Sequence, residues 1–207
     1  MVGASLNSVL MWSLAGYLAG SIPFAVLIGR LVVKVDPRTV GDGNPGGTNV
    51  WKAGGWKIGM AAAIVEILKG FFPVYLARQA GVADWALIPV SLSPILGHAT
   101  QPFLGWRGGK ALGTTGGAWV ALIGLWAFPV YAAGALTGLA VQREHAFAAL
   151  AGMLTLIAWA VFFDGSAWLI AFSLLNTGLI FWTHRGALGR DWRWRSWLTG
   201  MLLRREA

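Results

Sequence analysis

Cysteine is absent from this chain, and charged side chains are scarce. None of the 207 residues is a cysteine, which excludes disulfides, thiolate metal sites and a cysteine nucleophile. Only 12% of the residues are charged and 57% are hydrophobic. With a mean hydropathy of +0.63, this composition excludes an ordinary soluble domain. It predicts an all-α, polytopic integral membrane protein.

Long apolar runs recur along the whole chain, so a cleaved signal peptide does not explain the first of them. A run of about 18 or more apolar residues is long enough for a spanning helix. The run from 111 to 141 is too long for one crossing, and we predict two short helices that turn near Pro129. We expect about seven spans in a single domain of residues 1–207, drawn from these segments: 6–33, 56–77, 85–104, two within 111–141, 146–163 and 167–183.

The net charge of +8 is unevenly distributed. With seven spans, nearly all arginines and lysines fall on one side, whereas Arg78 lies opposite, among Asp84 and Asp164. The positive-inside rule makes the basic side cytoplasmic and puts the N-terminus outside. The tail, about 190–207, is rich in arginine and tryptophan and is predicted to anchor at membrane lipids. Nucleic acid is not expected as a partner, because no soluble basic domain is present.

A polar, glycine-rich segment at 36–55 interrupts the apolar sequence. Its glycines at 41, 43, 46 and 47 permit positive φ angles, so that successive backbone N–H groups can converge on an anion. Neutral donors and cations accompany them, namely Asn44, Thr48, Asn49, Arg38 and Lys52. We interpret the segment as a phosphate-binding loop, and the alternative is a solvated linker.

A second polar cluster ends in Gly108-Gly109-Lys110, directly before an apolar segment. Backbone N–H groups, a helix dipole and an ammonium would point the same way there, which suits a phosphate. The cluster lacks the nucleotide-binding pattern with four residues between its glycines, which argues against an ATPase. Upstream, His98 is either a base or an interfacial hydrogen-bonding residue.

Two further pairs of polar residues occur in the apolar segments. Glu66 and Lys69, three residues apart, share one helix face and either wall a site or clamp helices together. We favour the structural role. His184 and Arg185 close the last apolar segment, where they either join a cytoplasmic pocket or face lipid headgroups. Two anion-binding loops on one side of the membrane indicate substrates that together bring two phosphates.

The order of these motifs resembles the bacterial membrane glycerol-3-phosphate acyltransferases that use acyl phosphate as donor. The shared segments run through nearly the whole chain: Gly20-Ser-Ile-Pro23, Gly41 to Lys52, Glu66-Ile-Leu-Lys-Gly70, Gly97-His98, Trp106 to Lys110, and His184-Arg185. The resemblance implies a compact seven-helix membrane enzyme. It implies that the enzyme acylates glycerol 3-phosphate with acyl phosphate, releases lysophosphatidic acid and phosphate, and needs no metal, nucleotide or other cofactor.

The resemblance also implies roles for particular residues. One phosphate is assigned to Asn44, Thr48, Asn49 and Lys52, and the other to Gly108, Gly109 and Lys110. The expected catalytic residues are His98 and Lys110, with His98 as general base unless the substrate's own phosphate takes the proton. Further substrate contacts are expected at Arg38, Asp42, Lys69, His184 and Arg185. The acyl chain would lie between helices, open to the bilayer.

Several motif positions depart from the usual pattern of that family. Asp42 stands where serine is usual, and its charge is expected to repel a phosphate. Lys52 replaces an arginine and loses a bidentate fork. Glu66 replaces an aspartate, while Ala146 and Ala187 stand where serine and asparagine are usual. The alternatives are therefore a paralogue with a different acceptor, a membrane carrier for a phosphorylated solute, and a lipid-binding scaffold.

Overall fold

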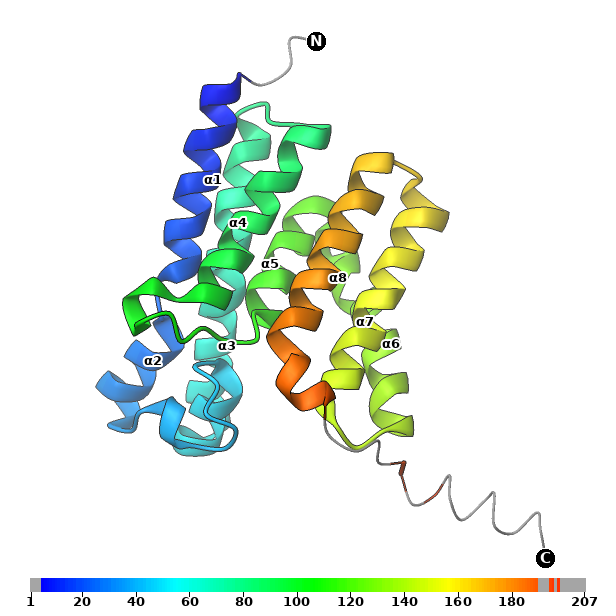
Figure 1. Ribbon diagram of the computed structural model, residues 1–207. Helices are drawn as coiled ribbons and strands as arrows, with labels where there is room; N and C mark the ends of the chain where they lie inside the picture. Colours follow the sequence, from blue (N-terminus) through cyan, green and yellow to red (C-terminus); the bar gives the residue numbers. More distant parts are fainter. Residues whose placement is uncertain (1–4, 190–193, 196, 198–207) are drawn as a thin grey trace, which may run out of the picture. The chain divides into compact units, whose positions relative to one another are not determined.

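The computed structural model describes residues 5–189, 194, 195 and 197. Within these residues the regular structure is helical, apart from one isolated bridge between Gln142 and Trp194 (Figure 1). The all-α prediction is confirmed. The contacts divide the chain into two compact units, 1–124 and 125–207, and each is described by itself. The single domain expected over 1–207 stays a prediction.

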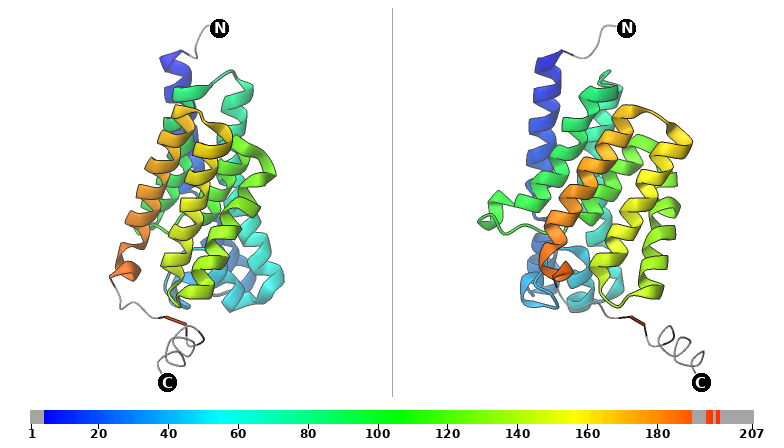
Figure 2. Two further views of the ribbon diagram at one scale, coloured as in Figure 1. Left: turned by 90° about the vertical axis from the view of Figure 1, so that its right-hand side faces the viewer. Right: turned by 45° about the vertical axis from the view of Figure 1, so that its right-hand side comes forward.

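In the first unit, α1 packs along α4, and α3 packs along α5 (Figures 1 and 2). Short turns of 3-10 or π helix follow α2 and flank α4. The α-helices of this unit in its described part are α1 (Leu6–Ser21), α2 (Phe24–Ile28), α3 (Gly47–Gln79), α4 (Leu87–Thr100) and α5 (Leu112–Ile123).

In the second unit, α7 (His145–Trp159) contacts both α6 (Ala127–Val141) and α8 (Ala167–Leu188). The predicted tail lies almost wholly outside the described residues. Two of its described members bind the end of α6: Arg195 Nε donates to the carbonyl of Leu139 at 3.0 Å, and Trp197 Nε1 donates to the carbonyl of Ala140 at 2.8 Å. These carbonyls would otherwise lack a helical partner, so part of the tail anchors on the protein itself.

The turn predicted near Pro129 is wrong, because the chain turns earlier, at Gly124. Gly124 has φ +72° and ends α5, a backbone conformation that glycine adopts without steric cost. Pro129 lies inside the first turn of α6. A proline is tolerated there, because its missing N–H would have no helical partner in that position. A proline therefore marked the start of a helix rather than the turn.

Five helical segments are long and apolar enough to cross a membrane, by length and composition: Leu6–Val33, Gly47–Gln79, Leu112–Val141, His145–Asp164 and Ala167–Leu188. The first of these is interrupted between α1 and α2, and α3 has a non-helical residue at Gly55, with φ +82°. The 14 residues of α4 are fewer than a full crossing needs. The count of seven spans and the cytoplasmic orientation of the loops stay predictions.

Gly70 is one of the places where α3 lies directly against α5. A methyl group there would collide with the backbone carbonyl oxygen of Thr114, and small residues allow such close approach in membranes. We expect Gly70→Ala to lower the free energy of unfolding by about 1–3 kcal/mol, measured by unfolding of the purified protein. The control is Gly178→Ala in α8, where an added methyl group meets open space. That variant is expected to be neutral or mildly stabilising, and equal losses would contradict the packing argument.

Candidate functional site

The polar segment before α3 forms a compact loop, residues 40–46, which we call the first loop. It is closed by its own backbone hydrogen bonds, from Gly43 N–H to the Val40 carbonyl at 3.2 Å and from Gly46 N–H to the Asn44 carbonyl at 2.8 Å. The positive φ angles predicted for this loop occur at Gly41 (+62°) and Gly43 (+75°). They do not occur at Gly46 or Gly47, where Gly46 is extended and Gly47 begins α3.

The second loop, residues 105–111, leads directly into α5, as the Gly-Gly-Lys motif predicts. It is pressed against the C-terminal end of α4: the N–H of Gly109 donates to the carbonyl of His98 at 3.1 Å. A methyl group at Gly108 would collide with the carbonyl of Ala99, and one at Gly109 would collide with His98 Nε2. Glycine is therefore required by the close approach at both positions.

The two loops bond to each other through Lys110. Its ammonium donates to Asp42 Oδ2 at 2.7 Å, and its backbone N–H donates to Asn44 Oδ1 at 3.0 Å. Both charged side chains are partly exposed, Lys110 at 31% and Asp42 at 46%, so the pair lies at the surface of the first unit. The sequence predicts two anion loops on one side of the membrane, and the tertiary structure brings them into direct contact.

Asp42 accepts hydrogen bonds on both carboxylate oxygens. Besides Lys110, the amide Nδ2 of Asn49 donates to Oδ1 at 2.9 Å, and the backbone N–H of Asn44 donates to it at 3.2 Å. Partial burial raises the pKa of Asp42, but the hydrogen bonds from Lys110, Asn49 and Asn44 together hold it well below its ordinary value. The carboxylate is therefore ionised at neutral pH. The negative charge of Asp42, which was expected to repel a phosphate, is therefore paired with the ammonium of Lys110.

A buried ionic cluster lies beneath the second loop. Glu66 Oε2 is 2.7 Å from Lys69 Nζ and 2.9 Å from His98 Nδ1. The cluster also satisfies the backbone where the chain breaks between α1 and α2: Ala25 N–H donates to Glu66 Oε1 at 3.0 Å, and Lys69 Nζ donates to the Ile22 carbonyl at 3.0 Å. Backbone groups freed by a helix break in a membrane need such partners.

His98 links the cluster to the loops, because its ring contacts Glu66 and its carbonyl accepts from Gly109. The i,i+3 spacing of Glu66 and Lys69 predicted their pairing, as the wall of a site or as a helix clamp, but gave no sign of the contact between Glu66 and His98. The predicted site residues that these contacts bring together are Asp42, Asn44, Asn49, Lys69, His98, Gly108, Gly109 and Lys110.

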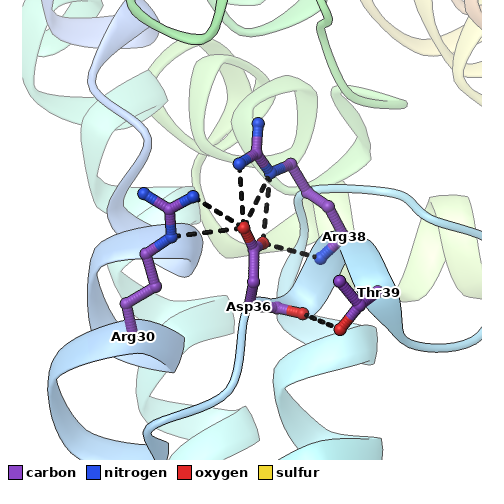
Figure 3. Close-up of polar contacts among 4 residues, drawn as sticks. All are labelled: Arg30, Asp36, Arg38 and Thr39. Atoms are coloured by element: carbon purple, nitrogen blue, oxygen red, sulfur yellow. Dashed lines mark hydrogen bonds and ion pairs between the residues drawn. The ribbon is translucent and has the colours of Figure 1, made fainter.

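Arg38 belongs to a separate polar group just before the first loop (Figure 3). The carboxylate of Asp36 lies between two guanidinium groups, with Oδ2 at 2.8 Å from Arg38 Nη2 and 2.7 Å from Arg30 Nη2. Hydrogen bonds from Arg38, more than any other contact, lower the pKa of Asp36 below its ordinary value. The guanidinium of Arg38 is ion-paired with Asp36. Its role as a substrate contact stays a prediction.

Of the remaining predicted residues, Thr48 and Lys52 are exposed on the first turns of α3. The ammonium of Lys52 lies against the first loop, because a methyl group added at Gly41 would be 2.8 Å from Lys52 Nζ. In the second unit, His184 Nδ1 is 2.8 Å from the carbonyl of Ile180, and Arg185 donates to the carbonyl of Trp182 at 2.6 Å. Whether this pair contributes to the site stays a prediction.

An apolar cleft of about 420 Å³ lies between α1 and α3. Its polar wall is Lys69, so the cleft reaches the buried ionic cluster. Several of its side chains are also partly exposed on the outside of the first unit. The walls include Trp12, Ile22, Leu68, Phe72 and Leu76. The described residues contain no group of three histidine, aspartate and glutamate side chains that could hold a metal ion.

Residues 10–193 match the family model described as glycerol-3-phosphate acyltransferase. The chain belongs to this family. A glycerol-3-phosphate acyltransferase of Thermus thermophilus is 37% identical over 184 residues, which cover 87% of this chain and 90% of the relative. One of Lawsonia intracellularis is 34% identical over 183 residues, with the same coverage of both chains.

The fold of the family has been solved in PlsY, an integral membrane glycerol 3-phosphate acyltransferase. Its glycerol 3-phosphate form is similar to this chain with a TM-score of 0.77 and 30% identity, covering 93% of each chain. Its lysophosphatidic acid form has the same TM-score at 28% identity. The family predicted from the motifs is confirmed, and this chain is a multi-pass integral membrane protein of the same family.

Proposed function

We propose that this protein transfers an acyl group from acyl phosphate to the 1-hydroxyl of glycerol 3-phosphate, in the plasma membrane of a bacterium. The products are lysophosphatidic acid and inorganic phosphate, so the reaction is the first step of phospholipid biosynthesis. The observation that carries the proposal is the direct bonding of two anion-binding loops, with Lys110 N–H on Asn44 at 3.0 Å, in a chain of this family.

The chemistry needs little beyond positioning. The hydroxyl oxygen of the acceptor attacks the acyl carbon, the bond between that carbon and the phosphate oxygen breaks, and phosphate leaves with the electron pair. Because acyl phosphate is a mixed anhydride with a good leaving group, the protein mainly holds two anions in line and stabilises their charge. The donors that would stabilise a phosphate are the ammonium of Lys110 and the side-chain amide of Asn49, which converge on the carboxylate of Asp42.

The acceptor hydroxyl must lose a proton, and we assign His98 as its base. His98 Nδ1 is held by Glu66 at 2.9 Å, while Nε2 lies against Gly109 in the second loop. A carboxylate on one ring nitrogen fixes the orientation of the ring and supports protonation of the other. The phosphate of the substrate itself is the alternative acceptor of the proton.

The acyl chain has an apolar path beside the cluster. The cleft of about 420 Å³ between α1 and α3 has aromatic and aliphatic walls, and Lys69 is one of its lining residues. These apolar walls suit the methylenes of an acyl chain. No metal or cofactor enters this reaction scheme.

The test is a turnover assay with purified protein in lipid. Acyl phosphate and glycerol 3-phosphate are supplied, and lysophosphatidate and phosphate are followed together, with equal amounts expected. Turnover no higher than that of Lys110→Ala would overturn the proposal for these substrates. Acyl phosphate consumption that does not depend on glycerol 3-phosphate would instead indicate a paralogue with a different acceptor.

A further inference from the structure

The carboxylate of Asp42 is surrounded by the kinds of donor that bind a phosphate. It receives an ammonium from Lys110 at 2.7 Å, a side-chain amide from Asn49 at 2.9 Å and a backbone N–H from Asn44 at 3.2 Å. Charge-assisted bonds from an ammonium, together with loop N–H groups, are the usual composition of a protein anion site. A negatively charged oxygen pair therefore already lies in this anion site.

The same donors serve the proposed function, which assigns Asn44, Asn49 and Lys110 to substrate phosphates. Each donor hydrogen directed at Asp42 is unavailable to a phosphate oxygen at the same moment. Asp36 differs from Asp42 in its partners, because the carboxylate of Asp36 pairs with Arg30 and Arg38, which lie outside both loops. Of these two acids, only Asp42 binds a donor from each loop.

We propose that Asp42 is an internal ligand of the phosphate site, whose carboxylate holds Lys110 until a substrate phosphate displaces it. The identity of that phosphate rests on the proposed function. The apparent affinity for a phosphate is then the intrinsic affinity reduced by the fraction of molecules in which Asp42 has released Lys110. Asp42 thus sets how tightly the site takes its phosphorylated substrate.

A simple repulsion between Asp42 and the phosphate predicts a different dependence on Lys110. Repulsion acts through space and persists when Lys110 is replaced, because the negative charge of Asp42 is still present. Competition for a shared partner disappears when that partner is removed. A double-mutant cycle of Asp42 and Lys110 separates the two mechanisms, because it measures the coupling between the residues.

The experiment measures binding of inorganic phosphate and of glycerol 3-phosphate to the purified protein in lipid nanodiscs by calorimetry. Asp42→Asn keeps the size of the side chain and removes its charge; Asp42→Ser provides the same test should the first variant not fold. We expect the dissociation constant to fall by about 3- to 10-fold in either variant. The matched control is Asp84→Asn, an exposed acid beyond the other end of α3, which is expected to change affinity less than about twofold.

In the Lys110→Ala background, the gain from Asp42→Asn is expected to fall below about twofold. The same gain in both backgrounds would show repulsion and overturn the internal ligand, as would no gain in the wild-type background. Binding of inorganic phosphate requires no turnover, so the internal-ligand proposal can be tested whether or not the protein catalyses acyl transfer. A Lys110-dependent gain in phosphate affinity without any acyl transfer would support the internal ligand and overturn the proposed reaction.

Discussion

Replacing Lys110 with alanine is expected to lower kcat/KM for acylation of glycerol 3-phosphate by about 100- to 1,000-fold, the usual cost of losing one group that stabilises transition-state charge. The ammonium of Lys110 reaches Asp42 in the first loop, while its backbone N–H bonds Asn44. The variant keeps the N–H and loses the only part that carries charge. Initial rates of lysophosphatidate formation measure the effect.

The matched control for this variant is Lys57→Ala. Lys57 is an exposed lysine of α3 whose ammonium lies 5.8 Å from the ring centre of Trp56, in neither loop. Its loss is expected to change kcat/KM by less than about twofold. Equal rates for the two alanine variants would contradict a role of Lys110 in the chemistry. Lys110→Arg keeps the charge with a different geometry and is expected to retain part of the activity.

Replacing Glu66 with alanine is expected to destabilise the protein by about 3–5 kcal/mol, because it leaves one partner of a buried ion pair without its counter-charge. Lys69 loses the carboxylate at 2.7 Å, and the N–H of Ala25 loses its acceptor at 3.0 Å. An unsatisfied buried donor adds to the cost. Unfolding of the purified protein, followed by its helical signal, measures the change in free energy.

Two further variants separate charge from hydrogen bonding at Glu66. Glu66→Gln keeps an acceptor for Ala25 N–H but no charge, and a smaller loss than in Glu66→Ala is expected. In the double variant Glu66→Leu/Lys69→Met neither charge remains, and much of the stability is expected to return, because apolar replacement of a buried pair is often close to neutral. A double variant no more stable than Glu66→Ala would contradict the role of the uncompensated ammonium.

Much of the candidate site could be predicted, because most of its polar residues lie in two short segments of the sequence. Glycine, asparagine and lysine in residues 41–52 and 108–110 indicate anion loops wherever the loops lie in space. The start of α5 at Leu112, shortly after the Gly-Gly-Lys segment, also followed from local sequence. The position of the turn between α5 and α6 could not be predicted in this way, because glycine and proline both occur at turns and the segment contains Gly124 as well as Pro129. In the structure α5 ends at Gly124, whose φ of +72° is accessible to glycine without steric cost.

The partners of the charged side chains could not be predicted from spacing alone. Glu66 and Lys69 are neighbours on one helix face, so their pairing follows from the 3.6-residue period. His98 comes from α4 and meets Glu66 of α3 only because the helices of the first unit pack together. Asp42 and Lys110 are 68 residues apart in the chain. The sequence suggested that Asp42 repels a phosphate, and it did not reveal that Asp42 binds Lys110.

By itself, the sequence determined that this is an all-α membrane protein, the family to which it belongs, and the two loops that suit phosphates. Those conclusions depend on composition, on run length and on the chemistry of short motifs, all of which are local properties. Only the tertiary structure decided that Lys110 of the second loop binds the first loop, that His98 contacts Glu66, and that Asp42 lies within the anion site. The physical reason is that electrostatic and hydrogen-bond energies depend on distances of a few ångströms, which helix packing sets and sequence separation does not.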